Sequence, residues 1–180
     1  MKMSEALSSF LKFGRVCLLC FLFTSAPAWS NDESISLHDF AALIPLWEVP
    51  QGSPYTIIGD GGYGYGWYQI HQVMVDDYNR ITGKDVAHEV AFDPAFSHHI
   101  AVTVLAHYAK HITSQGITLK IDHLLFIWNG GGNAWRRVEN PINDEKQRNL
   151  ERYKSRATPI LKQYFNEQKK RRQSQKGTQI

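Results

Sequence analysis

The chain contains little cysteine. Cys17 and Cys20 are the two cysteines among its 180 residues, and both lie within the first 28. We expect this segment to be removed, so the mature chain would have no cysteine, which excludes disulfides, thiol catalysis and cysteine–metal sites. Its stability must then come from a hydrophobic core. With 43% hydrophobic and 12% aromatic residues, the chain has enough apolar material for one domain.

Long hydrophobic runs are also absent. The run 16–23 follows a positively charged leader and is too short to span a bilayer, which takes about 20 residues. The small residues Ala26 and Ala28 then form a cleavage signal. The sequence therefore predicts a signal peptide over 1–28, a periplasmic or secreted protein, and no stable membrane span after cleavage. An uncleaved anchor and a lipid on Cys20 remain as alternatives.

Basic residues are few outside the end of the chain. Residues 29–167 contain 12 Lys or Arg and 16 Asp or Glu, whereas 168–180 contain five Lys or Arg and no acid. The body has no basic stripe, so a nucleic-acid partner is not expected. We expect 166–180 to be a basic, disordered tail, which could alternatively hold the protein near an anionic wall polymer or membrane surface.

Several familiar catalytic motifs are missing. The chain has no Gly-x-Ser-x-Gly elbow, P-loop or dinucleotide fingerprint. His107 and His111 are spaced like metal ligands on a helix, but no Glu follows His107, and His98-His99 lacks a third partner. We interpret these histidines as surface or cap residues, and we predict no metal and no cofactor.

Apolar periodicity and end signals predict a mainly helical α+β domain over 29–165. Asp93-Pro94 is a typical helix start, and Pro45 predicts a kink in the first helix. The segment 55–68 predicts two short strands joined by a glycine turn, a small β-hairpin. The expected helices cover 37–47, 71–81, 93–111, 121–128 and 144–165.

Glu48 is the first candidate for chemistry. It ends the first apolar helical segment, beside Trp47 and Val49. Partial desolvation there would raise the pKa of the carboxyl, which suits a general acid at a glycosidic oxygen. The alternative is a solvent-facing glutamate at a helix end.

Two amides are further candidates. Gln69, between Tyr68 and Ile70, could hold a backbone group, or a sugar amide or hydroxyl. Asn129 precedes three glycines, whose backbone could form a thin wall beside a ligand or simply end the helix.

Taken in order, these elements resemble the lysozyme-like superfamily, in particular the lytic transglycosylase domains of bacteria and phages. The resemblance covers about 39–157. It rests on an acid that ends the first helix, on Gly66-Trp-Tyr-Gln69-Ile70, on Trp128-Asn129-Gly130 and on a late tyrosine, Tyr153. It implies a lysozyme-like fold with a cleft flanked by the hairpin.

The resemblance also implies an activity. The substrate would be peptidoglycan glycan strands, cleaved at the β-1,4 bond between N-acetylmuramic acid and N-acetylglucosamine. Glu48 would protonate the leaving oxygen and then act as a base on the muramic 6-hydroxyl, which closes an anhydro ring without a second carboxylate. Gln69, Tyr65, Asn129 and Tyr153 would hold sugars or orient Glu48.

Other functions remain open. Asp60 is the acid near the motif that could make the enzyme a hydrolysing lysozyme. Val49 stands where the family usually has serine, and Pro45 interrupts the first helix, which would suit a wall-binding or assembly factor with weak or no catalysis. A secreted helical interaction protein is a further alternative. The small size favours a local role, as in secretion or conjugation machines.

Overall fold

Residues 35–177 are described by a computed structural model of the chain. The expected signal peptide, with both cysteines, lies outside this range. Within it the protein is mainly helical, with one two-stranded antiparallel sheet. No helix in the described range is long and apolar enough to cross a membrane.

The first helical segment is broken where the sequence predicts. The helix α2 (Leu37–Leu43) is capped by the Ser36 hydroxyl, which accepts from the Asp39 amide at 3.0 Å. Pro45 cannot donate a backbone hydrogen bond, and it begins a new short helix, α3 (Pro45–Glu48). Val49 is extended, so Glu48 ends the helical segment.

The segment 55–68 contains less strand than its residues suggest. The strands β1 (Ile58–Gly59) and β2 (Gly64–Tyr65) pair antiparallel around the short 3-10 helix η1 (Asp60–Gly62). The expectation of a strand over 55–58 was wrong for its first part, because Pro54 sets a turn in which the Ile57 amide donates to the Pro54 carbonyl. A bridge between Tyr65 and Ile70 closes the hairpin region.

Three further helices agree with the sequence signals. The helix α4 (Gln72–Thr82) is capped at its C-terminus by Gly83, with φ +69°. The helix α5 (Pro94–Ser114) is capped at its N-terminus by Asp93, whose side chain accepts from two backbone amides. The short, apolar α6 (Ile121–Gly130) follows. Two short elements were not predicted from the sequence: the 3-10 helix η2 (His88–Phe92) and the single turn α7 (Arg136–Glu139).

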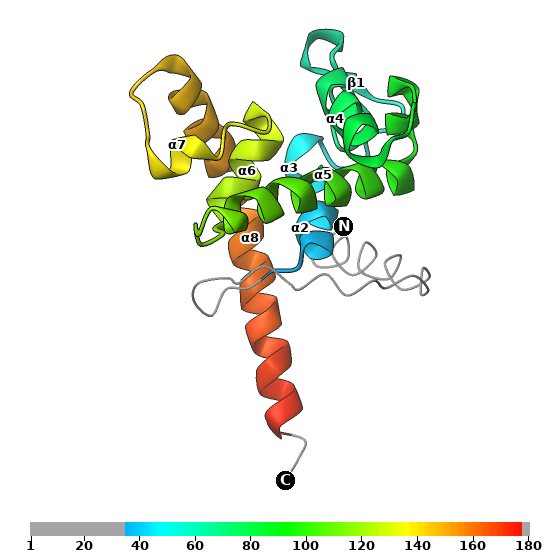
Figure 1. Cartoon of the computed structure of the whole chain (residues 1–180). Helices are drawn as coiled ribbons and strands as arrows, with labels where there is room; N and C mark the ends of the chain where they lie inside the picture. Colours follow the sequence, from blue (N-terminus) through cyan, green and yellow to red (C-terminus); the bar gives the residue numbers. More distant parts are fainter. Residues whose placement is uncertain (1–34, 178–180) are drawn as a thin grey trace.

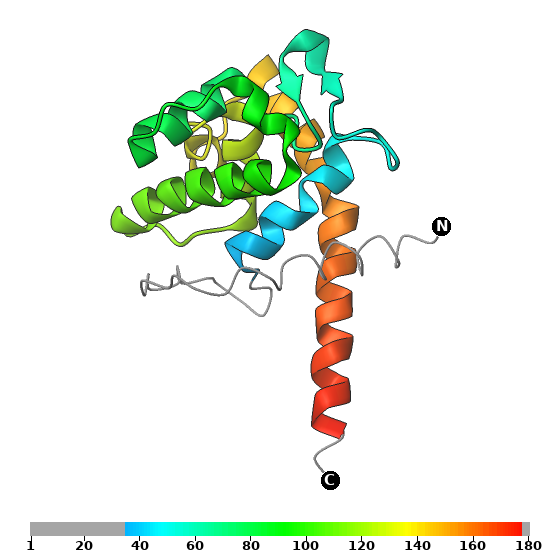
Figure 2. The same cartoon turned by 90° about the vertical axis from the view of Figure 1, so that its right-hand side faces the viewer.

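The last helix is longer than expected. The helix α8 (Glu145–Gly177) continues past Pro159 and past residue 165, and Figures 1 and 2 show its second half projecting from the body. Disorder from 166 was therefore wrong up to Gly177. Lys, Arg and Gln are good helix formers, and Gly177 is the first glycine after Gly132.

The core lies where α2, α5, α6 and α8 meet. Its fully buried members include Phe40, Leu105, Phe126 and Tyr153. In Figure 1 the end of α3 lies between the α4–β1 part of the chain and the α6–α7 part. Glu48, at the end of α3, therefore lies close to residues of α6 and α8.

Candidate active site

Glu48 receives two hydrogen bonds at a single oxygen. The Tyr153 hydroxyl of α8 donates to Glu48 Oε1 at 2.5 Å, and the Trp128 indole N–H of α6 donates to the same atom at 3.1 Å. The Tyr153 hydroxyl in turn accepts from the Trp47 indole N–H at 2.7 Å. The relay from Trp47 through Tyr153 fixes the orientation of the carboxyl group.

The environment raises the pKa of Glu48. Desolvation by burial is the largest cause, and the charge of Asp60 acts weakly in the same direction. The hydrogen bond from Tyr153, the charge of Arg156 and the bond from Trp128 oppose it. The net effect favours the protonated carboxyl, as the apolar neighbours of this residue predict.

The second carboxyl oxygen of Glu48, Oε2, is available to a ligand. Both donors go to Oε1, and within residues 35–177 no hydrogen bond is assigned to Oε2. The residue is half-buried rather than sealed in the core. A proton on Oε2 would therefore be available for transfer to a bound molecule.

The Gln69 side chain lies inside the hairpin. Its amide N–H₂ donates to the Gly66 carbonyl at 2.8 Å, and its backbone has φ +49°. A Cβ on Gly59 would lie 2.1 Å from Gln69 Oε1, and a Cβ on Gly64 would lie 2.6 Å from it. The amide therefore packs directly on two glycines of the paired strands. Two roles were considered for Gln69, and the contacts in this structure are those of the first, in which it holds a backbone group.

The other two hairpin candidates have partners nearby. The Tyr65 ring stacks on His88 at 3.9 Å between ring centroids and on Phe92 at 4.8 Å. Asp60 has φ +48° and pairs with the His71 imidazole at 2.9 Å, with 68% of its side chain exposed. The hairpin reaches the acid through Tyr68, whose ring contacts Trp128 edge-on.

Asn129 and Tyr153 line one open depression with a volume of about 600 Å³. Glu48 is not part of its lining and is linked to it through the hydrogen bond from Tyr153. Asn129 is exposed in the last turn of α6, whereas the rest of the lining comes from α8. The α8 residues that line it are Asn149, Arg152, Tyr153, Ser155 and Arg156.

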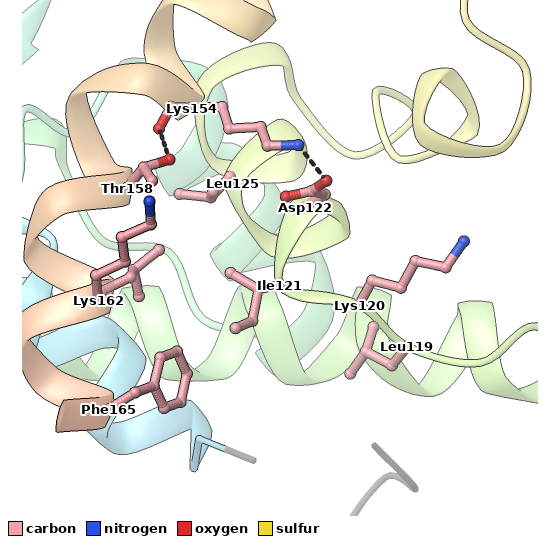
Figure 3. Close-up of a pocket in the computed structure, with 10 residues that line it drawn as sticks. Leu119, Lys120, Ile121, Asp122, Leu125, Lys154, Thr158, Lys162 and Phe165 are labelled. Carbon is pink, nitrogen blue, oxygen red and sulfur yellow. Dashed lines mark hydrogen bonds and ion pairs between the residues drawn. The ribbon is translucent and has the colours of Figure 1, made fainter. Parts of the chain in front are cut away.

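A separate cavity of about 360 Å³ lies between α6 and α8 (Figure 3). Asp122 is the acid in its lining, and it is paired with Lys154 at 2.5 Å. At 3.6 residues per turn, Lys154 and Thr158 lie on the face of α8 opposite to Arg156. This cavity is therefore distinct from the surroundings of Glu48.

Three residues around Glu48 were not singled out as site residues from the sequence. Trp47 and Trp128 supply indole donors, and Arg156 supplies a positive charge. The spacing of Arg156, three residues after Tyr153, would place both side chains on one helical face. Trp47 and Trp128 are the sequence neighbours of Glu48 and Asn129. Nothing in the sequence indicates that their indole N–H groups donate hydrogen bonds at the site.

Comparison with protein-family models, with curated proteins and with solved structures gives no match for this chain. Among residues 35–177, no group of three or more His, Cys, Asp or Glu side chains is placed to hold a metal ion.

Proposed function

We propose that the protein is a lytic transglycosylase of lysozyme-like fold that cleaves the bond between N-acetylmuramic acid and N-acetylglucosamine in peptidoglycan. The observation that carries the proposal is the state of Glu48: half-buried, with a raised pKa, and held at Oε1 by Tyr153 and Trp128. A carboxyl in this setting is suited to general acid catalysis.

In the proposed reaction, Glu48 gives the proton on Oε2 to the glycosidic oxygen. The bond between that oxygen and the anomeric carbon of muramic acid breaks, and the N-acetylglucosamine end leaves as an alcohol. The carboxylate that forms stays hydrogen-bonded to Tyr153 and Trp128, and these bonds favour its charged form. It then accepts the proton of the muramic 6-hydroxyl as that oxygen bonds to the anomeric carbon. The proton count is unchanged at the end of the cycle, and an anhydro product is released.

The proposal assigns the chemistry to one carboxylate. Asp60, the candidate for a second, is largely exposed and pairs with His71. The N-acetyl group of the substrate would support positive charge at the anomeric carbon in its place, which is a substrate-assisted exception to the two-carboxylate scheme.

The remaining candidates divide between binding and support. Asn129, exposed at the depression, would contact sugars or their substituents, whereas the buried Tyr153 would orient Glu48 through its hydrogen bond. Gln69 and Tyr65 would shape the hairpin wall, given their contacts with Gly66 and His88. Peptidoglycan lies outside the inner membrane, so an exported protein with a local remodelling role, in a secretion or conjugation apparatus for example, is part of the proposal.

The test is Glu48→Gln with purified wall as substrate. Gln keeps an oxygen that accepts from Tyr153 and Trp128 but has no acidic proton. We expect turbidity clearance to fall by about 10²-fold or more. Glu89→Gln, an exposed change on η2, is the matched control and should clear wall like the wild type.

Mass spectra of the released fragments separate the alternatives. Anhydro ends support the transglycosylase, whereas reducing ends would indicate a hydrolysing lysozyme that uses Asp60. A wild-type protein that binds wall but releases no fragments would instead indicate a binding or assembly factor. Clearance by Glu48→Gln at the wild-type rate would refute the enzymatic role of this acid.

A further inference from the structure

The depression beside Tyr153 is built from one polar stripe of α8. Asn149, Arg152, Tyr153 and Arg156 recur at intervals of three and four residues, so they share a helical face. Asn129 at the end of α6 faces this stripe across the depression. The buried member, Tyr153, connects the stripe directly to Glu48.

The lining is positively charged and contains no acid. Arg152 donates to the Asn149 side-chain oxygen and to the Arg148 carbonyl, and Arg156 lies over the Tyr153 ring at 5.1 Å. Within residues 35–177, neither guanidinium is assigned a carboxylate partner. In contrast, Arg137 and Arg80 are each paired with an aspartate.

Arg156 also lies near the reacting acid. The charge of Arg156 is one of the causes that lower the pKa of Glu48 against the larger effect of burial. Arg156 lies over the ring of Tyr153, whose hydroxyl bonds Glu48, so an anion held by Arg156 would lie near the glycosidic oxygen that Glu48 protonates. Guanidinium groups bind carboxylates through paired, charge-assisted hydrogen bonds, and the amides of Asn129 and Asn149 can bind peptide groups.

We propose that this depression, which we name the arginine pocket (Asn129, Asn149, Arg152, Tyr153, Ser155 and Arg156), binds a free carboxylate of the peptide stem on the substrate's muramic acid. The inference rests on the proposed function and adds a specificity to it. The enzyme prefers glycan strands that carry peptide stems over strands from which the stems have been removed. Arg152 and Arg156 determine this preference.

Binding is measured in the Glu48→Gln background, so that the substrate is not consumed. The probes are a disaccharide–tetrapeptide fragment with free carboxylates, the same fragment with its carboxylates amidated, and the peptide-free disaccharide. We expect the free-acid fragment to bind at least about tenfold more tightly than the other two. This advantage should weaken as salt is raised, since the arginines are exposed.

Variants then assign the effect to the pocket. Arg152→Gln with Arg156→Gln should abolish the advantage of the free-acid fragment, and Arg→Lys at both positions should restore part of it, because the charge returns without the fork geometry. Lys110→Gln, which removes an exposed charge from α5, is the matched control and should retain the full advantage. Thermal melts of every variant exclude loss of folding as the cause.

The outcomes separate the two proposals. If wild-type protein cleaves wall but the double Gln variant still prefers the free-acid fragment, the arginine pocket is refuted and the transglycosylase stands. The pocket is equally refuted if inorganic phosphate binds it while stem carboxylates give no advantage. If the protein neither cleaves wall nor binds any fragment, the proposed function fails.

Discussion

Replacing Tyr153 with Phe removes one oxygen from the centre of the site. That oxygen donates to Glu48 Oε1 at 2.5 Å and accepts from the Trp47 indole N–H at 2.7 Å. The tyrosine is 1% exposed, so water does not readily replace it. The ring of Phe would keep the packing, and the change therefore isolates the two hydrogen bonds.

The stability effect follows from the unpaired groups. A buried donor without a partner costs about 1–3 kcal/mol, and here the Trp47 N–H loses its acceptor. For a domain of this size we expect the melting temperature to fall by about 3–10 °C. Tyr63→Phe is the control, since that ring is exposed and should melt like the wild type.

The second effect is on the acid itself. The Tyr153 hydrogen bond lowers the pKa of Glu48 against burial, so its loss should raise that pKa further. A carbon-13 NMR titration of the Glu48 carboxyl measures this directly and needs no catalytic activity. In activity profiles, the alkaline limb should move to higher pH, because the acid stays protonated longer.

A Tyr153→Phe variant whose Glu48 pKa is unchanged or lower, and whose melting temperature equals that of the wild type, would refute this role of the hydroxyl. Such a result would mean that the Tyr153 hydroxyl does not bond Glu48 in solution. It would also remove the orientation on which the use of Oε2 depends.

Three further predictions concern stability. Gly66→Ala should lower the free energy of unfolding, measured by urea denaturation, by about 3 kcal/mol or more, because φ is +70° and the new Cβ would lie 2.1 Å from the Ala91 carbonyl oxygen. The control Gly52→Ala has φ +84° but nothing within 4 Å of the new Cβ, so it should cost only about 1 kcal/mol. Glu48→Gln should melt above the wild type near neutral pH, because a folded pKa raised above the unfolded value means that the buried charge destabilises the wild type at higher pH. The advantage should shrink as pH falls through the raised folded pKa and should be gone once pH reaches the unfolded value of 4.5. Ending the chain after residue 165 should change the melting temperature by less than about 2 °C, since the rest of α8 is mostly exposed; a larger fall would show that this end stabilises the domain.

Helix ends were predictable because their chemistry is local. Ser36 and Asp93 cap the amides that follow them, and Gly83 adopts the left-handed conformation after α4. The β content was overestimated, because aromatic residues suggested strands where Pro54 and the glycines form turns. The length of α8 was underestimated, because basic composition was taken as a sign of disorder although it does not disfavour a helix.

The site was predictable only in part. Glu48 and Tyr153 are 105 residues apart, and only the resemblance to a family suggested that they belong together. Nothing in the spacing of Trp47, Trp128 or Arg156 shows that they gather around one carboxyl. Such contacts depend on how α3, α6 and α8 pack, which local patterns do not specify.

Gln69 shows why a motif can be recognised while the role of its residues is not. Its oxygen would lie only 2.1 Å from a Cβ on Gly59 and 2.6 Å from a Cβ on Gly64, so glycine at both positions leaves room for the amide. The amide holds Gly66, and the turn that follows positions Tyr68 against Trp128, a donor to Glu48. The glycines, Gln69 and Glu48 are therefore linked through packing. A substitution at Gln69 would affect the proton donor, Glu48, through the hairpin.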